Sequence, residues 1–171
     1  MIENKVANSG LVQLDLESFY PNPNDFVAFD IKDFLFQGLL LKEKDFRESL
    51  KNHDWDQYEN CIVAIHCSEE DAIIQKWAYM LIASYLENHC KNYFFGTIQE
   101  AIDKQIFENI DQFDSSAYQD AMIVLKGCSD KPISDEAYLK ISQKLLPVVK
   151  TLMFGEPCST VPIYKRKKIA K

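Results

Sequence analysis

The apolar segment Asn60–Ser68 (NCIVAIHCS) constrains the fold more than any other part of this chain. Residues 61–67 are apolar on both alternating faces, which is typical of a central strand covered by helices on both sides. Ser68 and the acidic residues at 69–71 form a capping-box-like pattern that predicts a helix start. Apolar residues at helical spacing from Ile73 to Leu86 support that helix. The segment therefore predicts a strand, a turn and a helix.

The same unit recurs later in the chain. Asn92–Phe95 is a short aromatic strand, and Thr97 after it caps a predicted helix. Ala121–Lys126 is a third apolar strand, and a helix is expected from Ser134 to Leu152. Strands that alternate with helices imply right-handed crossovers and parallel pairing. We predict one α/β domain, residues 1–171, with a mainly parallel sheet flanked by helices.

The two ends of the chain are expected to lie outside this regular part. Residues 1–24 are predicted as an N-terminal arm, because Pro21–Asn24 has the composition of a loop. Strands expected at 11–16 and 26–31 can pair antiparallel at a sheet edge. Residues 154–171 are predicted as a proline-containing loop followed by a basic tail.

Charge and hydropathy exclude several classes of function. The 171 residues carry a net charge of -7, and no basic stripe precedes the C-terminal tail, so nucleic acid is not expected as a partner. Met1–Gly10 lacks the basic start and apolar core of a signal peptide. The longest apolar run, Trp77–Ala83, is too short to span a membrane. We expect a cytoplasmic protein without membrane contact, whose five cysteines are reduced.

Three cysteines are each followed by serine: Cys67, Cys128 and Cys158. The first two end predicted strands, and the carboxyl ends of parallel strands share one sheet edge, where open α/β folds bind ligands. Cys158 lies in a loop bounded by prolines and can return to that edge. With His66 as a fourth ligand, these residues suit zinc or an iron–sulfur species. In the alternative interpretation each cysteine is a small apolar residue at a strand end.

A catalytic role is less favoured. Cys67 before a helix and Cys128 between lysines would have the lowered pKa of a nucleophile, but neither has an evident base. The chain also lacks a glycine-rich phosphate loop and a G-x-S-x-G elbow. No catalytic residue is therefore assigned, and any cofactor other than a metal stays unknown.

Four segments resemble a known family: GLLLKEKDFRESLKNHDW at 38–55, KWAYMLI at 76–82, KGCSDKP at 126–132 and MFGEPCSTVPIYKR at 153–166. They are similar to a bacterial domain-of-unknown-function family, DUF2480, over nearly the whole chain. The resemblance implies genes that often lie beside those for iron–sulfur cluster assembly. It therefore implies an accessory protein that handles metal or sulfur, with iron–sulfur assembly proteins as partners.

A second hypothesis comes from another class of protein. The order of elements after residue 44 is similar to that of STAS-type regulatory modules, which bind partners without catalytic residues. In that case the cysteines are structural, and the N-terminal arm and the tail are candidate contacts of a homodimer. The two hypotheses differ in whether the cysteines must lie close together.

Overall fold

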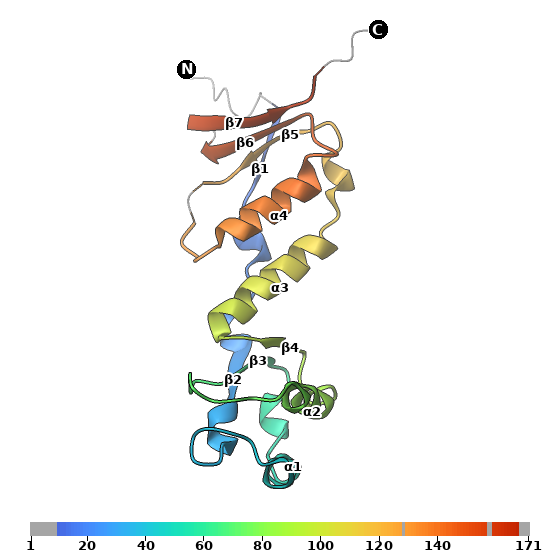
Figure 1. Ribbon diagram of the computed structural model, residues 1–171. Coiled ribbons are helices and arrows are strands. Elements are labelled where there is room, and N and C mark those ends of the chain that lie inside the picture. The colour runs from blue at the N-terminus through green and yellow to red at the C-terminus, as the bar shows by residue number, and fades with distance from the viewer. Residues whose placement is uncertain (1–9, 128, 157–158, 168–171) are drawn as a thin grey trace. The chain divides into compact units, whose positions relative to one another are not determined.

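The computed structural model describes residues 10–127, 129–156 and 159–167 (Figure 1). The chain divides into two compact units. Unit 1 consists of Met1–Tyr20 and Gln105–Lys171, and unit 2 of Pro21–Lys104. The helix α3 (Ile98–Gln112) contributes residues to both. The assignment of residues 1–171 to a single domain stays a prediction.

Unit 1 contains a four-stranded sheet in the order β1-β5-β6-β7. Its strands are β1 (Leu11–Leu14), β5 (Met122–Leu125), β6 (Thr151–Glu156) and β7 (Ser159–Lys165). The first three pair in parallel, and β7 runs antiparallel to β6. The helix α4 (Asp135–Leu145) lies beneath the strands in Figure 1. Fully buried residues of this unit include Ile123, Val124, Ala137, Ile141, Leu145 and Leu152.

Unit 2 contains a three-stranded parallel sheet in the order β2-β3-β4. The strands are β2 (Phe26–Asp30), β3 (Ile62–His66) and β4 (Asn92–Phe95), and the helices α1 (Glu43–Lys51) and α2 (Lys76–Leu86) belong to the same unit. The central strand β3 is buried at consecutive positions, since Val63 and Ala64 are both 0% exposed. The prediction of a strand covered on both faces is confirmed. The core includes Phe29, Phe46, Leu50, Ile65, Ala78, Ile82 and Leu86.

The predicted fold class is confirmed, because the strands are mainly parallel and flanked by helices. The strands lie in two sheets, however, and the antiparallel strand is at the other end of the chain. β1 and β2 each pair in parallel with a distant strand, as long connections through helices favour. β7 follows β6 directly along the chain, and such consecutive strands pair antiparallel.

Two local predictions are wrong. The helix expected from Ser68 begins only at Lys76. The backbone N–H of Ser68 instead donates to the Asp30 carboxylate at 3.0 Å, a partner that is distant in the sequence. The helix expected as far as Leu152 ends at Leu145, shortly before Pro147, which cannot continue it.

The chain after this helix is more regular than expected. Leu152 belongs to β6, and residues 159–165 of the predicted C-terminal loop form β7. At the other end, the strand expected at 11–16 is confirmed as β1, within the predicted N-terminal arm. Pairing with β6 thus orders residues 159–165, whose own composition is that of a loop.

Candidate functional site

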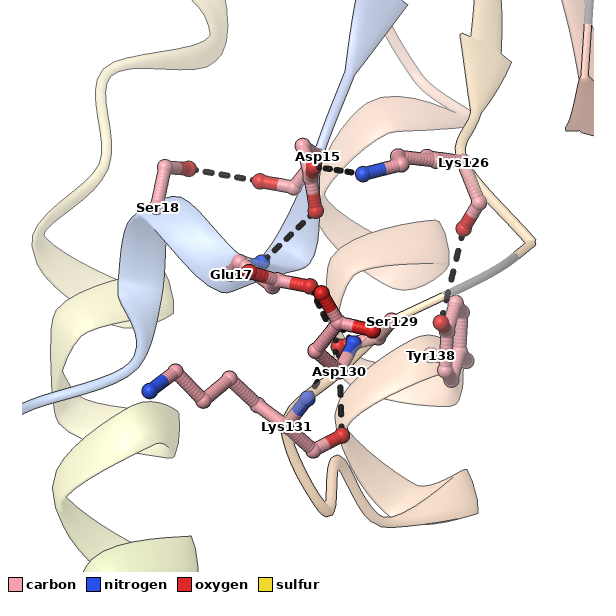
Figure 2. Close-up of polar contacts among 8 residues, drawn as sticks. All are labelled: Asp15, Glu17, Ser18, Lys126, Ser129, Asp130, Lys131 and Tyr138. Atoms are coloured by element: carbon pink, nitrogen blue, oxygen red, sulfur yellow. Dashed lines mark hydrogen bonds and ion pairs between the residues drawn. The ribbon is translucent and has the colours of Figure 1, made fainter.

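The parallel strands of unit 1 place their carboxyl ends at one edge of the sheet. Asp15 follows β1 and Lys126 follows β5, and the ammonium of Lys126 lies 2.8 Å from the Asp15 carboxylate (Figure 2). This hydrogen bond lowers the pKa of Asp15 and raises the pKa of Lys126, against the smaller effect of burial on both. The two groups are therefore charged together over a wide pH range.

Glu17 connects the end of β1 to the segment that follows β5. Its Oε1 accepts hydrogen bonds from the Ser129 hydroxyl and the Asp130 backbone N–H, both at 2.9 Å (Figure 2). The Ser129 Oγ also accepts from the Lys131 N–H at 3.0 Å. The Lys131 carbonyl is a second acceptor at 3.1 Å, but an ionised carboxylate is the stronger acceptor for the single hydroxyl proton. Glu17 thus fixes the position of residues 129–131.

A cavity of about 650 Å³ lies beside this segment, between α4 and the strands of unit 1. The volume is within the roughly 300–1,000 Å³ that is usual for small-molecule sites. Half of the lining residues have aliphatic or phenyl side chains, and these make most of the cavity surface apolar: Leu125, Ile133, Leu139, Leu152, Phe154 and Ile163. The remaining lining residues are Gly127, Ser129, Lys131, Asp135, Tyr138 and Ser142. The cavity is therefore mainly apolar, with a few polar groups.

The two hydroxyl side chains of α4 that line the cavity, Tyr138 and Ser142, are engaged with the protein itself. Tyr138 packs edge to face on Phe154, with ring centroids 5.7 Å apart, and its hydroxyl donates to the Lys126 carbonyl at 3.4 Å. The Ser142 hydroxyl donates to the Tyr138 carbonyl one helical turn earlier, at 2.7 Å. These contacts hold the helix side of the cavity in place.

Two glycines let the ends of β5 and β6 approach closely. A Cβ on Gly127 would lie 3.1 Å from the Gly155 Cα, which is tighter than ordinary contact. Gly155 has φ +119°, a conformation that side chains rarely adopt, and a Cβ there would lie 2.5 Å from the Ser159 carbonyl oxygen. Glycine is therefore required at position 155.

Unit 2 has a smaller cavity of about 400 Å³, also at the carboxyl ends of its strands. His66 and Cys67 both line it, together with Tyr79, Phe95 and Glu100 among others. Adjacent residues of a strand face apart, but β3 ends at His66, so that rule does not separate the two side chains. The prediction that these two residues lie at a sheet edge that could take a ligand is thus consistent with the structure.

Asp30 lies at the end of the strand next to β3. Burial raises its pKa, but hydrogen bonds from Ser68 and from the Lys32 N–H, together with the charge of His66, outweigh this effect and bring the pKa to about 2. Asp30 therefore stays ionised at neutral pH and holds the segment after β3 against the end of β2.

The predicted metal ligands do not all fall within the described part of the chain. His66 and Cys67 belong to unit 2, whereas Cys128 and Cys158 lie outside the described residues. The strands before Cys67 and Cys128 are in different sheets, so a shared sheet edge no longer brings these residues together. Among the described residues, no three His, Cys, Asp or Glu side chains are placed to hold a metal ion. The four-ligand site stays a prediction.

Sequence reasoning missed Asp15 and Glu17. Asp15 lies within the strand expected at 11–16 and Glu17 directly follows it, and their partners lie 111 to 113 residues away in the sequence. It also missed Tyr138, which falls within a predicted helix. None of these residues belongs to a motif that can be recognised by spacing.

The fold and its cavities define an α/β protein with two mainly parallel sheets and a cavity in each unit. The model of a family described as "Protein of unknown function (DUF2480)" matches residues 1–166. The chain belongs to this family, as its segments predicted. No curated protein and no solved structure matches it significantly. None of the helices in the described ranges has the length and apolarity that crossing a membrane requires.

Proposed function

We propose that the protein is a non-catalytic binding protein whose ligand occupies the unit 1 cavity. The observation that carries this proposal is the cavity itself, mainly apolar and about 650 Å³ in volume, which lies between α4 and the strands and reaches the carboxyl end of β5. The Glu17 contacts that fix residues 129–131 support it, because a preformed wall lowers the cost of ordering on binding. The hydroxyls in the lining serve structural hydrogen bonds, which favours binding over catalysis.

Filling the cavity tests the proposal. Ser142 lines it from α4, whereas the next residue, Gln143, is exposed and does not. Ser142→Phe should weaken binding of the neutral fluorescent probe N-phenyl-1-naphthylamine at least about tenfold, equivalent to about 1.4 kcal/mol. The matched control Gln143→Phe should bind as wild type does. Fluorescence titration measures both, and equal binding by the two variants would contradict the proposal.

A second candidate function is metal or sulfur handling during iron–sulfur cluster assembly. The pairing of β5 with β6 favours it, because Cys128 and Cys158 occur in the segments that follow these neighbouring strands. The close approach of Gly127 to Gly155 supports the same proposal. Thiolates of such segments would be suitable ligands for zinc or an iron–sulfur species. Cys67 and His66 would belong to a separate site in unit 2.

Metal and sulfide analysis of protein purified without oxygen tests this second function. We expect wild type to retain zinc or iron, and both Cys128→Ser and Cys158→Ser to lose it. Cys61→Ser is the matched control, since the Cys61 thiol donates only to the nearby Glu59 carbonyl and should not affect the metal. Wild-type protein without metal would eliminate this candidate and favour the binding role with structural cysteines, as in the STAS-like hypothesis.

We further propose a cytoplasmic location. The described cysteines, Cys61, Cys67 and Cys90, are all free thiols, which is typical of a reducing compartment. With the second candidate function we propose iron–sulfur assembly proteins as partners. With the binding role we propose that the protein forms a homodimer.

A further inference from the structure

We infer that the ligand of the unit 1 cavity is an uncharged, mainly apolar small molecule, such as a long-chain alcohol. This inference rests on the proposed binding function and adds the chemical class of the ligand. Four properties of the lining carry it: where its cation points, how exposed its anion is, how its hydroxyl protons are used, and how exposed its apolar side chains are.

The cation of the lining is not directed at a ligand. In Figure 2 the side chain of Lys131 runs away from Tyr138. Its ammonium lies 5.6 Å from the centroid of the Tyr20 ring, within range of a cation–π interaction. The nearby Lys126 ammonium is paired with Asp15. A carboxylate or phosphate in the cavity would therefore lose water without gaining a cation, which is unfavourable.

The anion of the lining offers little to a cationic ligand. Asp135, the first residue of α4, is exposed to solvent. A single ion pair with an exposed carboxylate is screened by water and contributes little to binding. A cationic group deeper in the cavity would meet mainly apolar side chains.

The hydroxyls restrict the polar groups that a ligand can carry. The protons of Ser129 and Ser142 already go to Glu17 and to the Tyr138 carbonyl. A hydroxyl oxygen that has donated its proton can still accept a hydrogen bond. The Ser142 oxygen thus suits a ligand that donates one, as an alcohol does. A ligand whose only polar group is an acceptor would have no donor from these two residues.

The surroundings of the cavity favour an apolar ligand. Leu139 on α4 is 66% exposed and Ile163 on β7 is 56% exposed, and both line the cavity. A hydrocarbon ligand would remove these side chains from water, which is the dominant favourable contribution to such binding. The lining is therefore complementary to hydrocarbon along most of its surface.

Competition among three probes of ten carbon atoms each tests the inference. 1-Decanol, decanoate and decylammonium have nearly equal hydrocarbon chains and differ chiefly in the charge and chemistry of the head group. Each is titrated against N-phenyl-1-naphthylamine bound to the full chain, below the concentration at which micelles form. We expect 1-decanol to displace the probe at a concentration at least about tenfold lower than either ion, a difference of about 1.4 kcal/mol. Decanoate or decylammonium displacing the probe as well as 1-decanol does would overturn the inference.

The Ser142→Phe variant separates failure of this inference from failure of the proposed function. If wild type binds the probe, Ser142→Phe does not, and an ion competes best, the cavity is a binding site for a charged ligand and only the inference fails. If Ser142→Phe and wild type bind the probe equally, the cavity is not the site and both fail. The order in which the three compounds displace the probe thus tests the chemical class of the ligand. The effect of Ser142→Phe on probe binding tests whether the cavity is the binding site.

Discussion

His53 is a residue whose ionisation is linked to the packing of unit 2. Its ring packs edge to face on Trp55, with centroids 4.8 Å apart, and its Nε2 lies 3.0 Å from the Tyr58 hydroxyl oxygen. Burial lowers the pKa of His53 below its ordinary 6.5, and the charge of Asp54 only partly offsets this. Burial also raises the pKa of Tyr58 to about 12, so its hydroxyl stays protonated. The cluster is thus built around a neutral imidazole.

This environment predicts a loss of stability in mild acid. The unfolded chain binds a proton on His53 at its ordinary pKa of 6.5, whereas the folded chain binds it only at lower pH. The contribution to stability is therefore complete above 6.5 and is lost as pH falls from there towards the lower folded value. Urea unfolding between about pH 7.5 and pH 5.5 should show a declining free energy of unfolding in wild type and a smaller decline in His53→Phe.

His89→Gln is the matched control for this experiment. The side chain of His89 is 37% exposed and lies 3.4 Å from the exposed Asp56 carboxylate. The variant should keep the wild-type pH dependence. If the free energy of unfolding declines as steeply with falling pH in His53→Phe as in wild type, groups other than His53 cause the pH dependence.

At the scale of elements, the segment after β5 depends on a turn that is distant in the sequence. Glu17→Ala removes both hydrogen bonds to Ser129 and Asp130. We expect amide hydrogen exchange at Asp130 to become about tenfold faster, because hydrogen bonds to a charged acceptor typically contribute about 1.5–3 kcal/mol and part of this is lost to solvent screening. Binding of the neutral probe should weaken as well, since residues 129–131 adjoin the cavity.

Glu48→Ala is the control for Glu17→Ala, because Glu48 is an exposed helical residue of unit 2. It should leave exchange at Asp130 and probe affinity unchanged. Unchanged exchange in Glu17→Ala would show that residues 129–131 hold their position without this contact.

Two capping patterns show which elements can be predicted from the sequence. At Thr97 the prediction is confirmed, because the Glu100 N–H donates to the Thr97 hydroxyl oxygen at 3.3 Å and Glu100 accepts from the Thr97 N–H at 2.7 Å. At Ser68 a similar pattern does not form a helix cap, because the Ser68 N–H donates to Asp30 at the end of β2. Local patterns therefore predict an element correctly where no distant group competes for the same donor.

At the scale of the whole molecule, the sequence predicts strands and helices better than it predicts which strands pair. Alternating apolar residues predict β1 and β2, and continuous apolar or aromatic runs predict β3, β4 and β5, because burial on one or both faces of a sheet requires these patterns. Pairing depends on contacts such as β1 with β5, more than a hundred residues apart, and no local pattern encodes them. The strands consequently fall into two sheets rather than one.

The candidate sites, like the sheets, could be predicted from the sequence only in part. The general expectation that ligands bind at strand carboxyl ends led to the cavity lined by His66 and Cys67. It could not identify the larger cavity of unit 1, whose lining comes from α4 and three strands. Residues such as Tyr138 and Phe154 have ordinary positions in a helix and a strand, and only folding brings them together.

The conformation of Gly155 has a consequence for the sequence at this position. With φ +119° and the Ser159 carbonyl oxygen 2.5 Å from any Cβ, position 155 can accommodate only glycine. Any side chain at this position would have to displace the backbone of the hairpin that β6 and β7 form. In the segment FGEPCS, Gly155 is therefore a residue that the fold itself requires, whatever the role of the cysteine three positions later.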